Sequence, residues 1–363
     1  MKVKGIATAV MSAALALCCF LAAGCGSPSP ELEGAEGLTC SETYGGALSD
    51  KSYQTPDAAI SAYISDEINP SASVTDSRKL RDLSQDEISA LPLTEELKNS
   101  LTAAEEYTVT YSQPAATFDA AAGGSSRNVL LLTTGGGVYY LDPLPATGQE
   151  LSKSYFESAC GLDNYRNCTM TMTENVTATV DNVSSTSTVV MTMKIADGKC
   201  LMEMSYNIPG ETPYEAYICM EDGANGFNAY ISEDISSGWT QIDTPIDLGN
   251  GEIIDDFDDV LVVCDYDYTE LQKTDTGFTI RQEYFSDVVN QTIAAIAVGY
   301  DDVSVTSSDI FFYVAGGTLV RTYVNIAFDC SMSYLGESYA CNINSEAVLN
   351  VTDFGTTVVE VTL

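Results

Sequence analysis

The sequence predicts an α+β protein in which a small N-terminal α+β domain is followed by a curved antiparallel sheet covered by helices. Apolar and polar residues alternate through the strand-like segments between residues 168 and 231. This period of two is typical of strands with one buried and one solvated face. Asp197-Gly198 separates two of these segments and is a strong signal for a two-residue hairpin turn. Helix-start signals, the first at Thr55-Pro56, precede the sheet.

Methionine occupies many of the apolar positions in these segments, and seven of the ten methionines lie between residues 168 and 231. Folding the chain at Asp197-Gly198 gives three facing pairs: Ile195 with Cys200, Met193 with Met202 and Met191 with Met204. The next two loops give three more: Met204 with Tyr214, Met202 with Ala216 and Met220 with Phe227. The predicted structure is a meander whose buried face is rich in thioether groups.

The first 24 residues have the pattern of an export signal. Lys2 and Lys4 are followed by an apolar stretch over residues 6–21. The string Leu-Ala-Ala-Gly-Cys at residues 21–25 resembles a bacterial lipobox, in which the cysteine, here Cys25, becomes diacylated. An ordinary signal peptide is the alternative, and a transmembrane anchor is disfavoured because the apolar stretch is too short to span a bilayer comfortably. We therefore expect a lipoprotein anchored to the outer face of a bacterial membrane.

The composition is strongly acidic. The 363 residues include 15 Lys and Arg, 52 Asp and Glu and no His. Two of the basic residues belong to the leader, so the mature chain has 13 basic residues and a net charge of −39. Such a charge repels nucleic acid and anionic lipid head groups, and nucleic acid is excluded as a partner. Residues 25–51, beginning with the lipidated cysteine, predict a flexible tether.

Residues 52–143 predict the small α+β domain. Thr55 caps a helix that ends at Asn69-Pro70, and Ser84 opens a second helix through a capping box with Glu87. Further elements are a helix over 95–105, a strand over 107–111 and a hairpin over 129–141. No functional site is expected in this domain.

Residues 144–149 predict an interdomain linker. Residues 144–148 spell the cell-wall sorting motif L-P-x-T-G, but that motif acts near a C-terminus, before an apolar segment and a basic tail. We interpret this match as coincidence. A helix capped between Thr147 and Glu150 and ended by Gly161 is expected next, and it could lie across the inner face of the sheet.

The remainder of the sheet domain, which spans residues 150–363, is expected to mix helices and strands. Helices are predicted over 253–264 and 288–296. A hairpin is predicted over 268–284, and strands over 310–314, 319–328, 339–344, 348–351 and 357–361.

Eight cysteines are left once the leader and the lipidated cysteine are set aside. An even number in an exported chain indicates disulfides. Cys330 and Cys341 lie symmetrically about Leu335-Gly336 and are the disulfide candidates. Cys200 and Cys219 are also symmetrical about a turn, but the alternation places them on opposite faces. Free thiols in a reducing habitat are the alternative.

No catalytic residue, cofactor or metal site is expected. The absence of histidine removes the usual base of serine and cysteine hydrolases and argues against zinc. Residues 260–271 match the nucleophile strand of haloacid-dehalogenase-type phosphatases at Asp265 and Asp267, but the β-rich remainder lacks the required βαβ crossovers. Glu270 stands where an EF-hand needs glycine. Weak calcium binding at the acidic surface stays an open alternative.

The methionine-rich face allows two interpretations. It is the core of the sheet, packed against the helix that precedes it, or it is a cavity for an apolar ligand, because methionine repacks readily around variable guests. The residues expected to line this cavity are Met170, Met172, Met191, Met193, Met202, Met204, Ile218, Met220, Phe227 and Tyr155.

Residues 150–363 resemble the lipoprotein-carrier (LolA-like) superfamily. The resemblance rests on the helix, the methionine-rich strands, the segment YEAYICMEDGANGFNAYISEDISSGWTQ at residues 214–241, a later helix and the closing VTDFGTTVVEV at residues 351–361. It implies a half-open antiparallel β-barrel that is plugged by helices and holds acyl chains. The expected function is therefore binding or carriage of a lipid or other hydrophobic ligand, without catalysis. The alternative is a structural or protein-interaction lipoprotein with a filled core, and its protein partners are not predicted.

Overall fold

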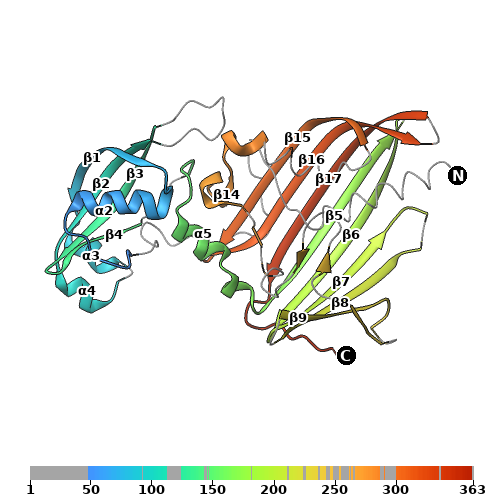
Figure 1. Cartoon of the computed structure of the whole chain (residues 1–363), viewed down its shortest axis with the longest axis horizontal. Helices are drawn as coiled ribbons and strands as arrows, with labels where there is room; N and C mark the ends of the chain where they lie inside the picture. The colour runs from blue at the N-terminus through green and yellow to red at the C-terminus, as the bar shows by residue number, and fades with distance from the viewer. Residues whose placement is uncertain are drawn as a thin grey trace.

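The computed structural model describes most of the chain after the predicted tether. The described residues are 48–91, 93–112, 124–142, 145, 147–180, 182–210, 212–223, 226–235, 238–242, 246–247, 253–254, 261, 263–264, 266–286, 290, 300–334 and 337–361. The predicted export signal, Cys25 and residues 113–123 lie outside these ranges. Figure 1 shows a first sheet near the N-terminal end of the described chain, a long second sheet, and helix α5 between them.

The first sheet has four antiparallel strands in the order β1-β2-β3-β4. Their bounds are β1 Ser73–Asp82, β2 Leu101–Ser112, β3 Gly124–Thr134 and β4 Gly137–Leu141. Four consecutive apolar residues of β3 are buried on alternating faces, because successive side chains of a strand point in opposite directions. Val129 and Leu131 pack in one cluster, and Leu130 and Leu132 pack in another.

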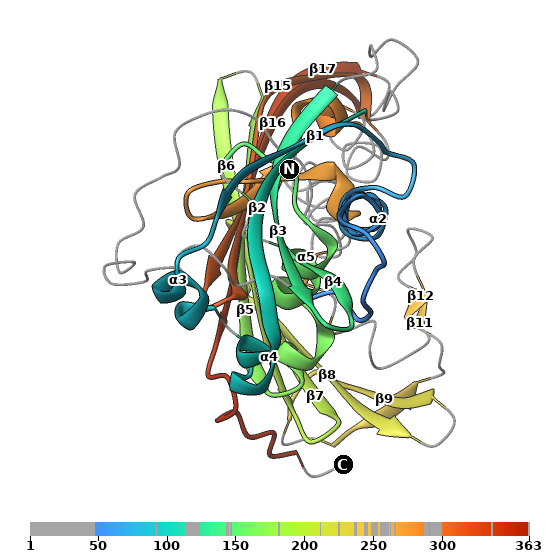
Figure 2. The ribbon, with the colours of Figure 1, turned by 90° about the vertical axis from the view of Figure 1, so that its left-hand side faces the viewer.

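Helices contribute to both clusters of the first sheet. Helix α2 (Pro56–Tyr63) is capped by Thr55 and continues as a π-helical turn, η1 (Ile64–Ile68). It supplies Ile60 and Tyr63 to the cluster of Val129. On the other side, Ile88 of α3 (Gln85–Ala90) packs against the cluster of Leu130. Figure 2 shows α2 on one side of the sheet, and α3 and α4 (Glu95–Ser100) on the other.

Several expectations for this domain are confirmed. The cap of α2, the capping box of Ser84 with Glu87 and the hairpin of β3 with β4 are all present. The third helix was predicted too long, because it ends at Ser100 and the chain continues as β2. Strand β1 was not predicted, since most of its residues are exposed and it shows no apolar alternation.

The second sheet has eleven antiparallel strands in the order β10-β9-β8-β7-β6-β5-β17-β16-β15-β14-β13. In the first half, the strands are β5 Cys168–Val180, β6 Val183–Ala196, β7 Lys199–Asn207, β8 Tyr214–Gly223, β9 Gly226–Ser232 and β10 Thr240–Ile242. In the second half, they are β13 Leu271–Lys273, β14 Gly277–Ile280, β15 Tyr300–Ala315, β16 Thr318–Tyr334 and β17 Glu337–Thr352. Ile246–Asp247 (β11) and Ile253–Ile254 (β12) form a separate pair.

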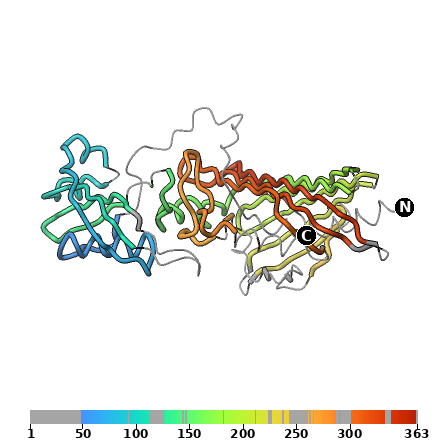
Figure 3. The backbone as a smooth tube through the Cα atoms, turned by 90° about the horizontal axis from the view of Figure 1, so that it is seen from above, coloured from blue at the N-terminus to red at the C-terminus, as the bar shows by residue number. Residues whose placement is uncertain are grey.

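The predicted fold class is wrong. The molecule is dominated by strands, and its large sheet is open between β10 and β13 instead of forming a half-open barrel covered by helices. Figure 3 shows the long strands of this sheet lying side by side from above. Strands β15, β16 and β17 have 16 or 17 residues each, well beyond the short apolar runs that predicted them. Ile253–Ile254, expected to be helical, is strand, and residues 255–260 and 291–299 lie outside the described ranges.

The register of the meander is partly confirmed. Ile195 pairs with Cys200, Met193 with Met202 and Met191 with Met204, as predicted. The next two hairpins are each shifted by two residues: Met204 pairs with Ala216, and Met220 pairs with Ala229. A shift of two preserves the face of every side chain. Between β7 and β8, the observed register also places the Tyr206 and Tyr214 rings 6.1 Å apart.

The residues predicted as linker contact both sheets: the Gly148 backbone N–H donates to the Lys273 carbonyl oxygen at 2.8 Å, and the Gln149 amide donates to the Ser126 carbonyl oxygen at 3.3 Å. The residues that flank the linker extend this contact. Glu150 bridges to Gln272, and the Arg127 guanidinium donates to the Glu150 carbonyl oxygen at 2.9 Å. Asp142 is fully buried and accepts hydrogen bonds from Tyr63 at 2.8 Å and from Ser154 at 2.9 Å. These bonds tie α5 (Lys153–Cys160), which Ser152 caps, to the first domain.

Among the described residues, no helix has the length and apolar character needed to cross a membrane. The predicted last strand, residues 357–361, is not formed. Thr357 instead bonds to Asn167 at the start of β5.

Candidate functional site: the methionine face

The apolar side chains of β5 to β9 form three rows that run across the strands. We call the side of the sheet that carries them the methionine face. The first row is Met170, Met193, Met202, Ile218 and Ile231. The second is Met172, Met191, Met204 and Ala216. The third is Cys168, Ile195, Cys200, Met220 and Ala229. The rows arise because residues two apart share a face and the antiparallel register aligns them.

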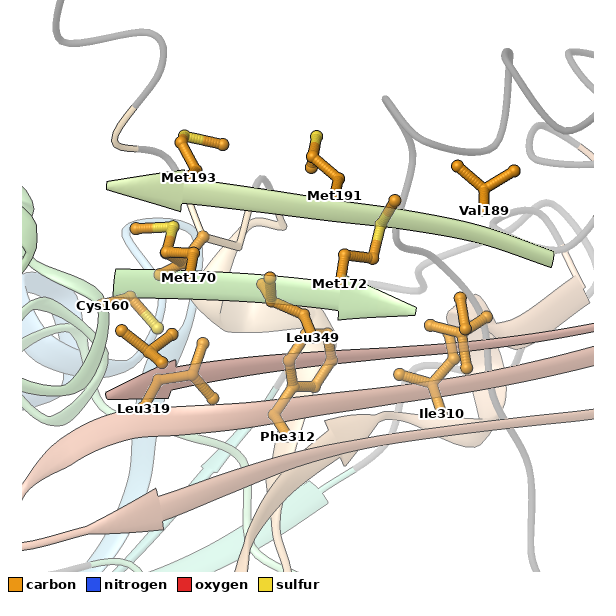
Figure 4. Close-up of a cluster of buried hydrophobic side chains, with 14 of the residues drawn as sticks. Cys160, Met170, Met172, Val189, Met191, Met193, Ile310, Phe312, Leu319 and Leu349 are labelled. Carbon is orange, nitrogen blue, oxygen red and sulfur yellow. The ribbon is translucent and has the colours of Figure 1, made fainter. Parts of the chain in front are cut away.

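Figure 4 shows four of these methionines on two neighbouring strands, with Met170 beside Met193 and Met172 beside Met191, all on the same side of the sheet. Phe312, Ile310 and Leu319 continue this face on the strands beyond. All seven belong to one buried apolar cluster. The sequence-based grouping of the methionines is therefore reproduced by the tertiary structure.

Burial along the first row decreases from β5 toward β9, whereas the residues of the third row are each no more than 1% exposed. In the first row, Met170 is 3% exposed, Met193 is 8% exposed and Ile231 is 38% exposed. Met202, Met204 and Ile218 are half-buried and pack at the margin of the cluster. Met172, Met220 and Phe227 are buried. Solvent therefore reaches the row from the side of β7 to β9.

Tyr155 lies in the same cluster but is not part of the rows. It is on α5, and the Lys273 ammonium group of β13 lies 5.8 Å from its ring centroid. Strand β13 is at the opposite end of the strand order from β9. Tyr155 therefore joins the cluster from α5, whereas the other residues predicted to line the cavity belong to β5 to β9.

Glu174 is the functional candidate that sequence reasoning missed. It belongs to β5, two residues after Met172 and two before Val176, and it is only 1% exposed. Ser345 of the neighbouring β17 donates a hydrogen bond to its carboxylate at 2.9 Å. The alternation itself contained this signal, because Glu174 occupies an apolar-face position between Met172 and Val176. A buried carboxylate on an apolar face is costly unless it is paired. The sheet must therefore provide a partner for Glu174, and Ser345 is one.

The disulfide candidates lie directly opposite each other. Cys330 of β16 pairs with Cys341 of β17, both are buried, and both are free thiols. Directly paired residues of an antiparallel sheet fall within the Cα separation that a disulfide needs. Burial, with a smaller effect of the adjacent Cys341, raises the pKa of the Cys330 thiol to about 12. The disulfide stays a prediction.

Two other thiols flank the first row on the methionine face. Cys168 and Cys200 are fully buried on β5 and β7. Burial raises the pKa of Cys168 to about 12 and holds that of Cys200 well above its usual range. Both side chains are therefore protonated near neutral pH. Cys219 lies on the opposite face, as predicted, since it pairs with Leu201.

Two further features lie away from the methionine face. A pocket of about 410 Å³ beside the C-terminal end of α5 is lined by Glu157, Ser158, Gly161, Leu162, Asp163, Asn164 and Arg166.

Asp267, from the phosphatase-like motif, accepts hydrogen bonds from Thr269 and begins a short 3₁₀ turn, η4 (Tyr268–Glu270). Asp265 is outside the described residues. Within the described ranges, no group of three or more Cys, Asp or Glu side chains is placed to hold a metal ion.

Comparison with known proteins returns no match: neither a family model nor a curated protein aligns with this chain.

Proposed function

We propose that this protein is a membrane-anchored, extracytoplasmic lipoprotein that binds a lipid or other hydrophobic ligand on the methionine face, without catalysis. The observation that carries this proposal is the first row, whose exposure rises from 3% at Met170 to 38% at Ile231. An apolar surface of this kind lets a chain-like ligand enter from the exposed margin. The membrane anchor and the resemblance to lipoprotein carriers are proposed from the sequence motifs at Cys25 and in residues 150–363.

The side-chain chemistry supports an apolar ligand. Met202, Met204 and Ile218 are half-buried on adjacent strands. Methionine side chains are unbranched and polarisable, so they repack around guests of different shape. Acyl chains require contact with apolar groups and no fixed polar geometry, which this margin offers.

A second function is favoured by a different observation. Met170, Met172, Met191, Met193 and Met220 are all less than 10% exposed. A face this well buried also suits a structural or protein-interaction lipoprotein with a filled core and no ligand.

Native mass spectrometry of the full chain, extracted from membranes in mild detergent, separates the two functions. A co-purifying lipid or other apolar molecule is expected if the protein binds one. Its absence, together with no uptake of a fluorescent fatty acid by the purified chain, would support the filled core.

A matched pair of variants tests the location. Met202→Gln introduces an amide at the half-buried margin of the face and should weaken fatty-acid binding. Ser205→Gln introduces the same group on the same strand, β7, but on the other face, and should leave binding unchanged. Equal binding by both variants would place the ligand elsewhere.

A further inference from the structure

Six methionines of the methionine face form a regular block on three adjacent strands. Met170, Met193 and Met202 are consecutive cross-strand neighbours on β5, β6 and β7. Met172, Met191 and Met204 repeat this arrangement two residues along. Apolar packing alone does not require sulfur at these positions, because leucine, isoleucine and valine fill sheet faces and β-branched residues suit strands better.

The central methionine of each group of three is directly opposite both of its partners, which are themselves two strands apart. Directly opposite residues have Cβ atoms about 4.5–5.5 Å apart, whereas positions two apart on a strand are separated by about 6.8 Å. Figure 4 shows Met170 and Met193 side by side on the same side of the sheet. Three rotatable bonds allow each thioether to turn toward a common point.

From this arrangement we infer that Met170, Met193 and Met202 form a binding site for a soft monovalent cation, Cu(I) or its analogue Ag(I). Thioether sulfur is a soft donor that selects Cu(I) over Ca²⁺, Mg²⁺ and Mn²⁺. The absence of histidine, which disfavours zinc, has no bearing on thioether ligands.

The first group is favoured over the second by its contacts. In the second group, the Tyr206 hydroxyl donates a hydrogen bond to the sulfur of Met204 at 3.5 Å. The first group also has a route to solvent, since Met202 is half-buried and its row continues to Ile231, which is 38% exposed. The chain's net charge of −37 attracts cations to the surface.

Thioethers carry no proton, so binding by the three methionines is independent of pH.

The test is anaerobic competition for Cu(I) between the full chain and a chromophoric chelator, bicinchoninate. The wild type is expected to withdraw Cu(I) from the chelator with the same affinity at about pH 5.5 and about pH 7.5, where the thiolate fraction of an ordinary cysteine differs about 100-fold. The combined variant Met170→Leu, Met193→Leu and Met202→Leu keeps the face apolar. Its affinity should fall by more than the roughly 10–100-fold that loss of an outer-shell partner costs.

Two further variants complete the design. Met332→Leu changes a buried methionine of β16 that pairs with Tyr300 and Tyr339 instead of another methionine, and it should bind Cu(I) as the wild type does. The single variant Met202→Leu alters a half-buried residue and should weaken binding at least about tenfold even if the triple variant does not fold.

The inference is overturned if the wild type does not compete for Cu(I), if affinity rises with pH as a thiolate site requires, or if the folded Leu variants bind normally. Since leucine preserves the apolar surface, fatty-acid binding by the same variants reports separately on the proposed function.

Discussion

The two sheets of the molecule bury their apolar side chains in different ways. In the first sheet, Val129, Leu130, Leu131 and Leu132 are each no more than 1% exposed, and helices pack on both faces. In the second sheet, the exposed fraction along the first row of the methionine face rises from 3% at Met170 on β5 to 38% at Ile231 on β9. The first sheet is buried on both sides by branched side chains, whereas burial along the first row of the methionine face is graded.

The difference indicates what each sheet can do. Branched side chains held between a sheet and its helices have few rotamers and specify one packing. Flexible thioethers at a graded margin can change conformation at little cost. We therefore expect the first sheet to act as a rigid support and the second to present the adaptable surface.

The largest effect should follow a charge placed on the methionine face. Met193→Asp buries a carboxylate on a residue that is 8% exposed, and we expect a loss of about 3 kcal/mol or more in the free energy of unfolding. Met202→Asp, at the half-buried margin, should cost less. Urea denaturation measures both. Thr192→Asp, on the solvated face of β6, is the control, and a Met193→Asp protein as stable as this control would show that the burial gradient is misplaced.

Truncation of a side chain should cost more stability in the first sheet than at the margin of the methionine face. Leu131→Ala creates a cavity in the fully buried core of the first sheet and should cost about 2–5 kcal/mol. Met204→Ala removes a side chain that is already partly solvated, so its cost should be clearly lower. Thermal or chemical unfolding of the two variants makes the comparison. A larger loss for Met204→Ala would contradict the graded face.

An intermediate effect is expected at the polar pair on the methionine face. Ser345→Ala removes the hydrogen bond that Ser345 donates to Glu174 and should destabilise the protein by about 1–3 kcal/mol, because both groups are buried. Thr177→Ala, on the solvated face of β5, where Thr177 shares an exposed hydrogen bond with Thr186, provides the comparison. Equal stability of the two variants would argue that the carboxylate does not depend on Ser345.

The smallest effect concerns the contact between the sheets. Burial raises the pKa of Glu67 above its ordinary value of 4.5, although the backbone N–H of Ser154 opposes the shift. A carboxyl with a raised folded-state pKa holds its proton more tightly when folded. Its contribution is therefore complete below the unfolded-state pKa and is lost as pH rises through the folded-state value.

Glu67→Gln removes this titration. Wild-type stability should fall relative to the variant as pH increases from about 4 to about 7, measured by urea denaturation at each pH. A difference between the two proteins that stays constant over this range would show that Glu67 titrates alike when folded and unfolded.

Much of the methionine face was predictable from local pattern. The alternation of Met191 and Met193 with Thr192 and Lys194 assigned each side chain to a face, and Asp197-Gly198 fixed the first hairpin. The later loops were predicted two residues out of register, because a shift of two leaves the apolar pattern unchanged and the pattern cannot distinguish the alternatives.

Other features depended on long-range contacts. The local sequence pattern did not indicate that β5 pairs with β17, which is separated from it by more than 150 residues. Nor did it show that the strands after residue 300 extend through polar residues, which led to the wrong fold class. Glu174 was visible in the alternation, but only the neighbouring Ser345 shows how its carboxylate is accommodated.

By itself, the sequence determined which side of each methionine-rich strand is apolar, because covalent geometry turns successive side chains to opposite faces. It also determined the acidic charge and the positions of the helix caps, since these depend on residues close together in the chain. Only the tertiary structure decided the order of the eleven strands, the open sheet and the decrease in burial along the first row. Those properties arise from pairings between distant segments, which no local pattern encodes.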